Sequence, residues 1–220
     1  MDPVWEKLHA SRFWGKYPSD HLVQTVLRRW QNIEERKSLR ALELGCGAGA
    51  NLSFLLTEGF QVSGVDGSAS AIKRAQSRMV YYTTPGQKLD LSVCYFEDLD
   101  FEPKSFDLVV DFFAVYANQK QVIERVIKGV HTMLCDGGMF YSRVWGMQTE
   151  GSQSGKQIEE GTSENPTCGP CADMGVSHFF TAEELNCLYS DWSNFTLTRV
   201  LSEQYPSEHP IEEFVIWAQK

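Results

Sequence analysis

Three glycines crowd the turn after the first apolar run of the sequence, in ALELGCGAGANLSFLL (residues 41–56). At such a turn Gly45 permits a tight bend, Gly47 lets the backbone approach a ligand closely, and Gly49 relieves crowding where a helix begins. Asp66 ends a second apolar run, where a carboxylate accepts hydrogen bonds from ribose hydroxyls. The spacing therefore predicts a cofactor site built on bare backbone, with Asp66 facing solvent when the site is empty.

Glu43 separates two hypotheses about this cofactor. Gly45, Gly47 and Ala50 satisfy the fingerprint G-x-G-x-x-G/A, which would favour NAD. Glu43, however, is an acid inside an otherwise apolar strand, and a pyrophosphate gains nothing from a neighbouring carboxylate. A cofactor that carries ammonium and sulfonium charges does gain from it. Glu43 therefore favours such a cofactor, and NAD remains the alternative.

Strands and helices must alternate along the chain to position these residues. Short apolar runs predict strands, while Gly59, Ser68 and a capping box of Thr181 and Glu184 mark helix ends. This alternation is typical of a parallel α/β sheet, and the last two segments predict an antiparallel hairpin. The predicted strands are 39–44, 61–66, 91–96, 106–113, 138–145, 195–203 and 212–220. The predicted helices are 19–30 with Ser19 as its cap, 48–60, 68–80, one marked by apolar residues across 122–133, and one opening at Thr181.

Four segments in this order resemble the class I S-adenosylmethionine-dependent methyltransferases of the small-molecule type: LELGCGAGANLSFLL, GVDGSASAI, SFDLVVDFFAVY and LCDGGMF. The resemblance implies an α/β fold: a single Rossmann-like domain, a mostly parallel seven-stranded sheet with a C-terminal antiparallel hairpin, and helices on both faces. It also implies S-adenosylmethionine as the cofactor. Within this domain (1–220) we expect an N-terminal helical cap or lid (1–37), a cofactor-binding core (38–145), a lid or substrate loop (146–177), and a C-terminal helix and hairpin (178–220).

The same resemblance assigns the cofactor contacts. Glu43 would organise the glycine loop and Asp66 would hold the ribose hydroxyls. Tyr95 stands where the family usually has an acid near the adenine amine, so the Phe96 backbone and the Glu97 side chain are the candidates for that contact. The implied cofactor-binding residues are Glu43, Gly45, Cys46, Gly47, Asp66, Gly67, Ser68, Phe96, Glu97 and Phe112.

Methyl transfer itself asks for a nucleophile held in line with the methyl group, and often for a base. His178 lies between a long polar loop and a capped helix and is the candidate catalytic base. Tyr17, Tyr116 and Asp111 are weaker candidates. The residues expected to contact the substrate or form a lid are Trp14, Tyr17, Phe113 and Tyr116.

Two segments fall outside the minimal sheet. The aromatic stretch WEKLHASRFWGKYP (5–18) is either a helix packed on the sheet edge or a lid that carries Trp14 and Tyr17. Residues 146–177 form a long polar stretch, and structureless loops of this length are usually lids, binding loops or disordered segments. We expect this second segment to be a lid.

The overall composition excludes some classes of function. A net charge of −9 and a pI near 5.1 argue against nucleic acid as a partner. No apolar run reaches the length of a membrane span, and MDPVWEKLHA lacks the core of a signal peptide, which predicts a cytoplasmic protein without a membrane partner. Cys168 and Cys171 form CGPC, but a single such pair in a polar loop is a weak signal for redox chemistry or metal, and we expect no metal. The oligomeric state is left open.

We therefore expect an enzyme that transfers a methyl group from S-adenosylmethionine to an oxygen or nitrogen atom of a small-molecule acceptor. The nearest alternative is a protein-lysine N-methyltransferase. A catalytically silent S-adenosylmethionine-binding subunit and an NAD-dependent oxidoreductase are alternatives from other classes.

Overall fold

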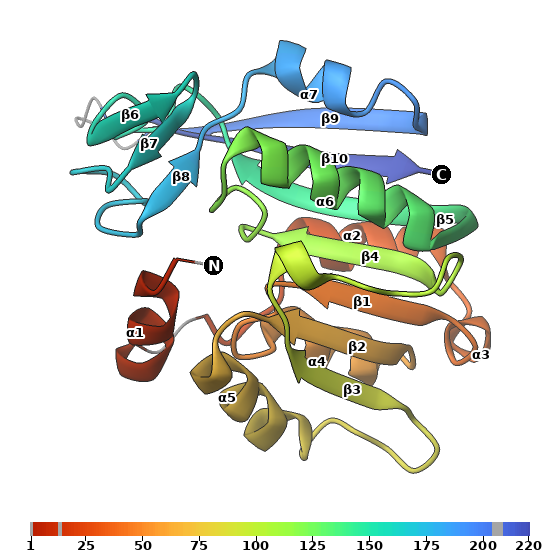
Figure 1. The fold of residues 1–220 in the computed structure, drawn as a ribbon. Coiled ribbons are helices and arrows are strands. Elements are labelled where there is room, and N and C mark those ends of the chain that lie inside the picture. The colour runs from red at the N-terminus through yellow and green to blue at the C-terminus, as the bar shows by residue number, and fades with distance from the viewer. Residues whose placement is uncertain (1, 13–14, 204–208) are drawn as a thin grey trace.

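A seven-stranded sheet forms the centre of the computed structural model, which describes residues 2–12, 15–203 and 209–220 (Figure 1). The strand order is β3-β2-β1-β4-β5-β10-β9; the first five strands are parallel, and β10 runs antiparallel to both β5 and β9. The predicted fold class, including the C-terminal hairpin, is confirmed. The strands are β1 (Arg40–Leu44), β2 (Gln61–Asp66), β3 (Leu89–Val93), β4 (Phe106–Phe112), β5 (Leu134–Trp145), β9 (Ser193–Ser202) and β10 (Ile211–Gln219).

The neighbourhood of β1 and β4 determines where a ligand fits. After β1 the chain turns to one side of the sheet to form β2 and β3, and β4 then returns to the other side of β1. In the register, Leu44 of β1 lies beside Val65 of β2 and Asp111 of β4. At such a switch point the loops diverge and leave a crevice at the carboxyl ends of the strands. The glycine loop and Asp66 both lie at this edge.

Helices cover both faces of the sheet (Figure 1), and their apolar side chains are buried in two clusters. Leu22, Leu52 and Ile72 join one buried cluster, from helices α2 (Asp20–Arg29), α4 (Ala50–Thr57) and α5 (Ala69–Met79). Ile123 and Leu185 join the other, from α6 (Lys120–Met133) and α7 (Ala182–Leu188). The remaining helices are α1 (Val4–Ser11), α3 (Ile33–Arg36) and the short 3-10 turn η1 (Phe96–Asp98). No helix in the described part of the chain is long and apolar enough to cross a bilayer.

Two local predictions were wrong. The third strand ends at Val93 instead of residue 96, because its pairing partner β2 ends at Asp66, opposite Val93. Ser19 occupies the N-cap position of α2, but its side chain makes no cap hydrogen bond. Its hydroxyl instead lies 2.8 Å from the Tyr141 hydroxyl inside the fold. Contacts with the neighbouring strand therefore outweigh the local cap.

Residues 146–177, which we call the lid segment, are not the structureless loop that their composition predicted. They include most of a second, antiparallel sheet of three short strands, β6 (Lys156–Glu159), β7 (Thr162–Glu164) and β8 (Val176–His178). Figure 1 shows this small sheet beside the carboxyl end of the main sheet. Strands this short carry too few alternating residues to be recognised in the sequence. The movement of the segment as a lid, and the division of the chain into cap, core and lid, remain predictions.

Candidate active site

A cavity of about 320 Å³ opens at the carboxyl edge of the main sheet. The loops after β1, β2, β3 and β4 form its base, Trp5 and His9 of α1 form one wall, and Pro170 and Met174 of the lid segment reach it from the other side. Most residues predicted from the sequence meet here. Those on the cofactor side are Glu43, Gly45, Cys46, Gly47, Asp66, Gly67, Phe96, Glu97 and Phe112; those assigned to the substrate are Tyr17, Phe113 and Tyr116.

The glycine loop has the bare backbone that its spacing predicts. Gly45 and Gly47 adopt φ angles of +63° and +51°, in the left-handed region that side chains disfavour. A Cβ atom on Gly45 would also lie 2.2 Å from the Cβ of Ala114, on the loop that follows β4. Glycine is therefore required at position 45 both by the backbone angle and by the close approach of a neighbouring loop.

Asp66 ties the glycine loop to the helix that follows β2. Its Oδ2 accepts a hydrogen bond from the Gly47 backbone N–H at 2.8 Å, and its Oδ1 accepts one from the Ser68 N–H at 2.8 Å. The residue is only 6% exposed, and this burial raises the pKa of its carboxyl group. We expected a solvent-facing side chain, which was wrong. Each carboxylate oxygen has a second lone pair, so both oxygens can still accept from a ligand hydroxyl.

Glu43 is a buried acid with one acceptor atom left over. Asn51 Nδ2 donates to its Oε1 at 2.6 Å, whereas its Oε2 is buried without a partner among the described residues. Burial raises the pKa of Glu43 to about 8. A buried carboxyl group beside a bare glycine loop fits a cofactor whose amino acid end is cationic, because the opposite charge would compensate its desolvation. The residues present therefore fit S-adenosylmethionine, with Glu43 and Asp66 as the acidic contacts.

Replacing Glu43 with glutamine is expected to make the free energy of unfolding fall less steeply as the pH rises. Between about pH 4.5 and 8 the unfolded chain releases the Glu43 proton while the folded chain retains it, so the free energy of unfolding falls through this window. Glutamine has no proton to retain. Urea unfolding at several pH values measures this slope, with the exposed Glu124→Gln as control. Parallel slopes for wild type and Glu43→Gln would contradict the assignment.

One end of the cavity is lined by aromatic side chains. Phe113 stacks on Trp145 with ring centroids 4.0 Å apart, and Tyr116 stands edge-on to both rings. Trp5 of α1 meets Tyr116 edge-on at 6.5 Å. Trp5 and Trp145 were missed as site residues. Trp145 could have been predicted from its position at the end of β5, because β5 and β4, which ends at Phe112, finish at the same edge of the sheet.

The turn after β3, where the resemblance implies the adenine contact, also lines the cavity. Cys94, Tyr95, Phe96 and Glu97 all line the cavity there. Ser68 does not: it is fully buried, its hydroxyl accepts from the Ala71 N–H at the start of α5, and it donates to Glu6 of α1. Its predicted place beside the adenine is therefore not supported, since the side chain holds two helices together.

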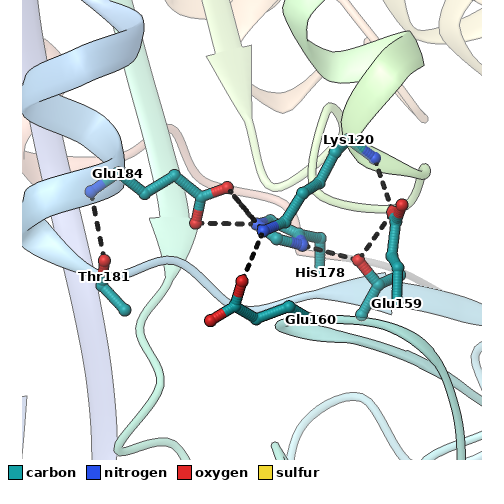
Figure 2. A network of polar contacts seen from close by, with 7 residues as sticks. Lys120, Glu159, Glu160, His178, Thr181 and Glu184 are labelled. Atoms are coloured by element: carbon teal, nitrogen blue, oxygen red, sulfur yellow. Dashed lines mark hydrogen bonds and ion pairs between the residues drawn. The ribbon is translucent and has the colours of Figure 1, made fainter.

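His178 lies away from the cavity in a polar network that Figure 2 shows. Its ring is 0% exposed, with Nδ1 at 2.7 Å from Thr162 Oγ1 and Nε2 at 3.1 Å from each carboxylate oxygen of Glu184. Glu159 of the small sheet also accepts from the Lys120 N–H, at the start of α6. Both ring nitrogens are engaged, so the geometry argues against His178 as the catalytic base. The network instead joins the small sheet to α6 and α7.

The other residues predicted as a base or as part of a lid are Asp111, Tyr17 and Trp14, and they differ in their position relative to the cavity. Asp111 is fully buried outside the cavity wall, where it accepts from the Ala114 and Val115 N–H groups and the Ser142 hydroxyl. It therefore shapes the turn after β4. Tyr17 lines the cavity but is 79% exposed. Trp14 lies outside the described residues.

The paired cysteines show no sign of a metal centre. Cys168 is exposed and Cys171 is buried, and both are free thiols. Across 2–12, 15–203 and 209–220, no three His, Cys, Asp or Glu side chains are grouped so that they could hold a metal ion.

Comparison with known proteins points to one family. Residues 41–138 match the family described as "Methyltransferase domain". An uncharacterized methyltransferase of Synechocystis sp. is 33% identical over 110 residues, which are 50% of this chain and 49% of that protein. The match thus spans about half the length of this curated relative. A SAM-dependent methyltransferase from Methanosarcina mazei is 25% identical, with a TM-score of 0.67 over 86% of this chain and 96% of its own.

A third likeness concerns the fold alone. The 1,6-didemethyltoxoflavin-N1-methyltransferase of Burkholderia thailandensis, solved with 1,6-didemethyltoxoflavin and S-adenosylhomocysteine, is 16% identical. Its TM-score is 0.59 over 94% of this chain and 93% of its own. The matched core, the shared fold and the acid-flanked glycine loop together confirm the resemblance found in the sequence. Residues 41–138 thus resemble a methyltransferase domain, and the fold is that of S-adenosylmethionine-dependent methyltransferases, which supports S-adenosylmethionine as the cofactor.

Proposed function

We propose that this protein transfers the methyl group of S-adenosylmethionine to an oxygen or nitrogen atom of a small-molecule acceptor. The observation that carries the proposal is the division of one cavity into two ends. Acidic groups and bare backbone at Glu43, Gly47 and Asp66 suit the cofactor, while Phe113 and Trp145 form an apolar wall for a second molecule. Transfer requires the nucleophile to approach in line with the methyl group, and a shared cavity provides this proximity.

The segments that lie over the cavity favour a small-molecule acceptor and disfavour the lysine side chain of a protein substrate. Trp5 of α1 and Met174 of the lid segment both reach the acceptor end, which narrows the access that a protein substrate would need. A lysine ammonium must also lose a proton before it can attack, and the described residues of this end include no carboxylate. The Burkholderia neighbour, bound to a small-molecule ligand, is consistent with this preference. We further propose a cytoplasmic location, since all six cysteines are free thiols.

Titration calorimetry with S-adenosylmethionine and with NAD tests the cofactor, and release of S-adenosylhomocysteine in the presence of a small-molecule panel tests the transfer. We expect binding of S-adenosylmethionine without binding of NAD, and turnover with members of the panel. Cofactor binding with no turnover, on small molecules or on lysine peptides, would support the silent-subunit alternative. Turnover on peptides alone would support a protein-lysine methyltransferase.

A further inference from the structure

The acceptor end of the cavity is built from aromatic rings packed against one another. Phe113 and Trp145 are nearly parallel, with 21° between their ring planes, and Tyr116 crosses them at 84° and 82°. Phe112 packs edge-on against Phe113 at 4.9 Å. Side chains held by each other in this way keep a fixed shape, and flat rings bind other flat rings by offset stacking or edge-to-face contact.

The backbone at Phe113 is held in an unfavourable conformation. Its φ angle is +53°, in the left-handed region that a bulky side chain rarely adopts. The Phe113 N–H donates to the Arg143 carbonyl at 3.0 Å, and Asp111 accepts from the two backbone N–H groups that follow. Strain of this kind is found mainly at functional sites, where the surrounding structure maintains it. Here it directs the Phe113 ring into the cavity wall, against Trp145.

The charged groups of the cavity lie at its other end. Glu43 and Asp66 belong to the glycine loop and β2, Glu97 follows β3, and His9 of α1 lies over Gly47. Among the described residues, the polar groups that line the acceptor end are uncharged: the Tyr116 and Tyr17 hydroxyls, the Asn118 amide, and the indole N–H groups of Trp5 and Trp145. The Asn118 amide donates to the Val115 carbonyl at 3.1 Å, and burial raises the pKa of Tyr116 well above its usual range. The lining of this end therefore carries no ionised side chain that would pair with a charged acceptor or remove a proton from it; the Arg143 guanidinium, 5.6 Å from the Phe113 ring centroid, is held by Glu213.

We propose that the acceptor is an uncharged, planar heteroaromatic molecule that is methylated at an unprotonated ring nitrogen; this inference rests on the proposed methyl transfer. The lone pair of such a nitrogen forms the new N–C bond as the C–S bond of the cofactor breaks. The electron pair of that bond stays on sulfur, and the sulfonium becomes the neutral thioether of S-adenosylhomocysteine. The product is an N-methylated cation. No proton is released, so no base is needed.

The experiment compares three classes of probe with the full chain. Quinoline, isoquinoline and acridine are planar and neutral; decahydroquinoline is saturated and cationic; quinoline-4-carboxylate is planar and anionic. Binding to protein loaded with S-adenosylhomocysteine is measured by calorimetry, and turnover with S-adenosylmethionine is measured alongside. We expect at least one neutral heteroaromatic to bind and react roughly 10-fold or more better than the charged analogues. Equal or better performance of either charged analogue, or failure of all three neutral probes to bind, would overturn the inference.

Phe113→Gly tests the role of the strained ring. Glycine tolerates the φ angle of +53°, so the backbone keeps its turn while the stacking surface is removed. We expect kcat/KM for the best neutral probe to fall roughly 10-fold or more, with S-adenosylmethionine affinity unchanged. Asn194→Gly relieves a similar backbone angle (φ 49°) in β9, far along the sheet, and is expected to change neither quantity. An unchanged kcat/KM in Phe113→Gly would overturn the inference, whereas absence of S-adenosylmethionine binding in the wild type would refute the proposed function itself.

Discussion

Replacing Asp66 with alanine is expected to weaken S-adenosylmethionine binding roughly 10- to 100-fold. Two hydrogen bonds from ribose hydroxyls to a carboxylate are lost, and bonds to a charged group contribute about 1.5–3 kcal/mol each before solvent compensates. The variant is also expected to be less stable. Its Gly47 and Ser68 N–H groups lose their acceptors, and a buried donor left unsatisfied costs about 1–3 kcal/mol.

Calorimetric titration beside a thermal melt separates these two effects of Asp66. Asp66→Asn retains one acceptor oxygen and is expected to lose less affinity and less stability than Asp66→Ala. Asp100→Ala removes an exposed carboxylate after β3 and serves as the control, with neither quantity changed. If folded Asp66→Ala bound the cofactor as tightly as wild type, Asp66 would be a structural residue only.

Replacing His178 with alanine is expected to lower the free energy of unfolding by about 2–4 kcal/mol, because its two ring hydrogen bonds are lost inside a buried network (Figure 2). The Glu184 carboxylate and the Thr162 hydroxyl each lose His178 as a hydrogen-bond partner. The small sheet of β6, β7 and β8 is then held less firmly against α6 and α7. We therefore expect faster amide exchange across 156–178, with S-adenosylmethionine affinity little changed, since the ring does not line the cavity.

The relative loss of stability and of kcat in His178→Ala distinguishes a structural role of His178 from a catalytic one. A catalytic base would show a collapse of kcat and a changed pH profile in a variant that unfolds like wild type. A residue that holds the small sheet in place lowers stability first and activity in proportion to it. His209→Ala is the control: that side chain is 64% exposed and pairs with Glu150 on the surface, where an ion pair contributes little.

The sequence alone predicted the central sheet and the meeting of the glycine loop, Glu43 and Asp66 at one cavity. Strand-to-helix alternation, the left-handed glycines and the acid at the end of β2 are local features, because each depends on residues close together in the chain. Glu43 followed from the same logic, since an acid in an apolar strand needs a reason. The family resemblance implied that Phe113, which follows β4, reaches the site, and Tyr116 was a candidate from the same segment; both line the cavity.

Only the tertiary structure decided which distant segments complete the cavity. Trp5 and Trp145 are separated by most of the chain, and their common wall with Phe113 arises from the packing of α1 and β5 around one crevice. His178 shows the converse: its neighbours in the sequence suggested the site, but pairing of β7 with β8 turns its ring toward Thr162 and Glu184. Local sequence determines which element a residue joins, whereas the direction of its side chain depends on long-range pairing and packing, which leave no periodic signal in the sequence.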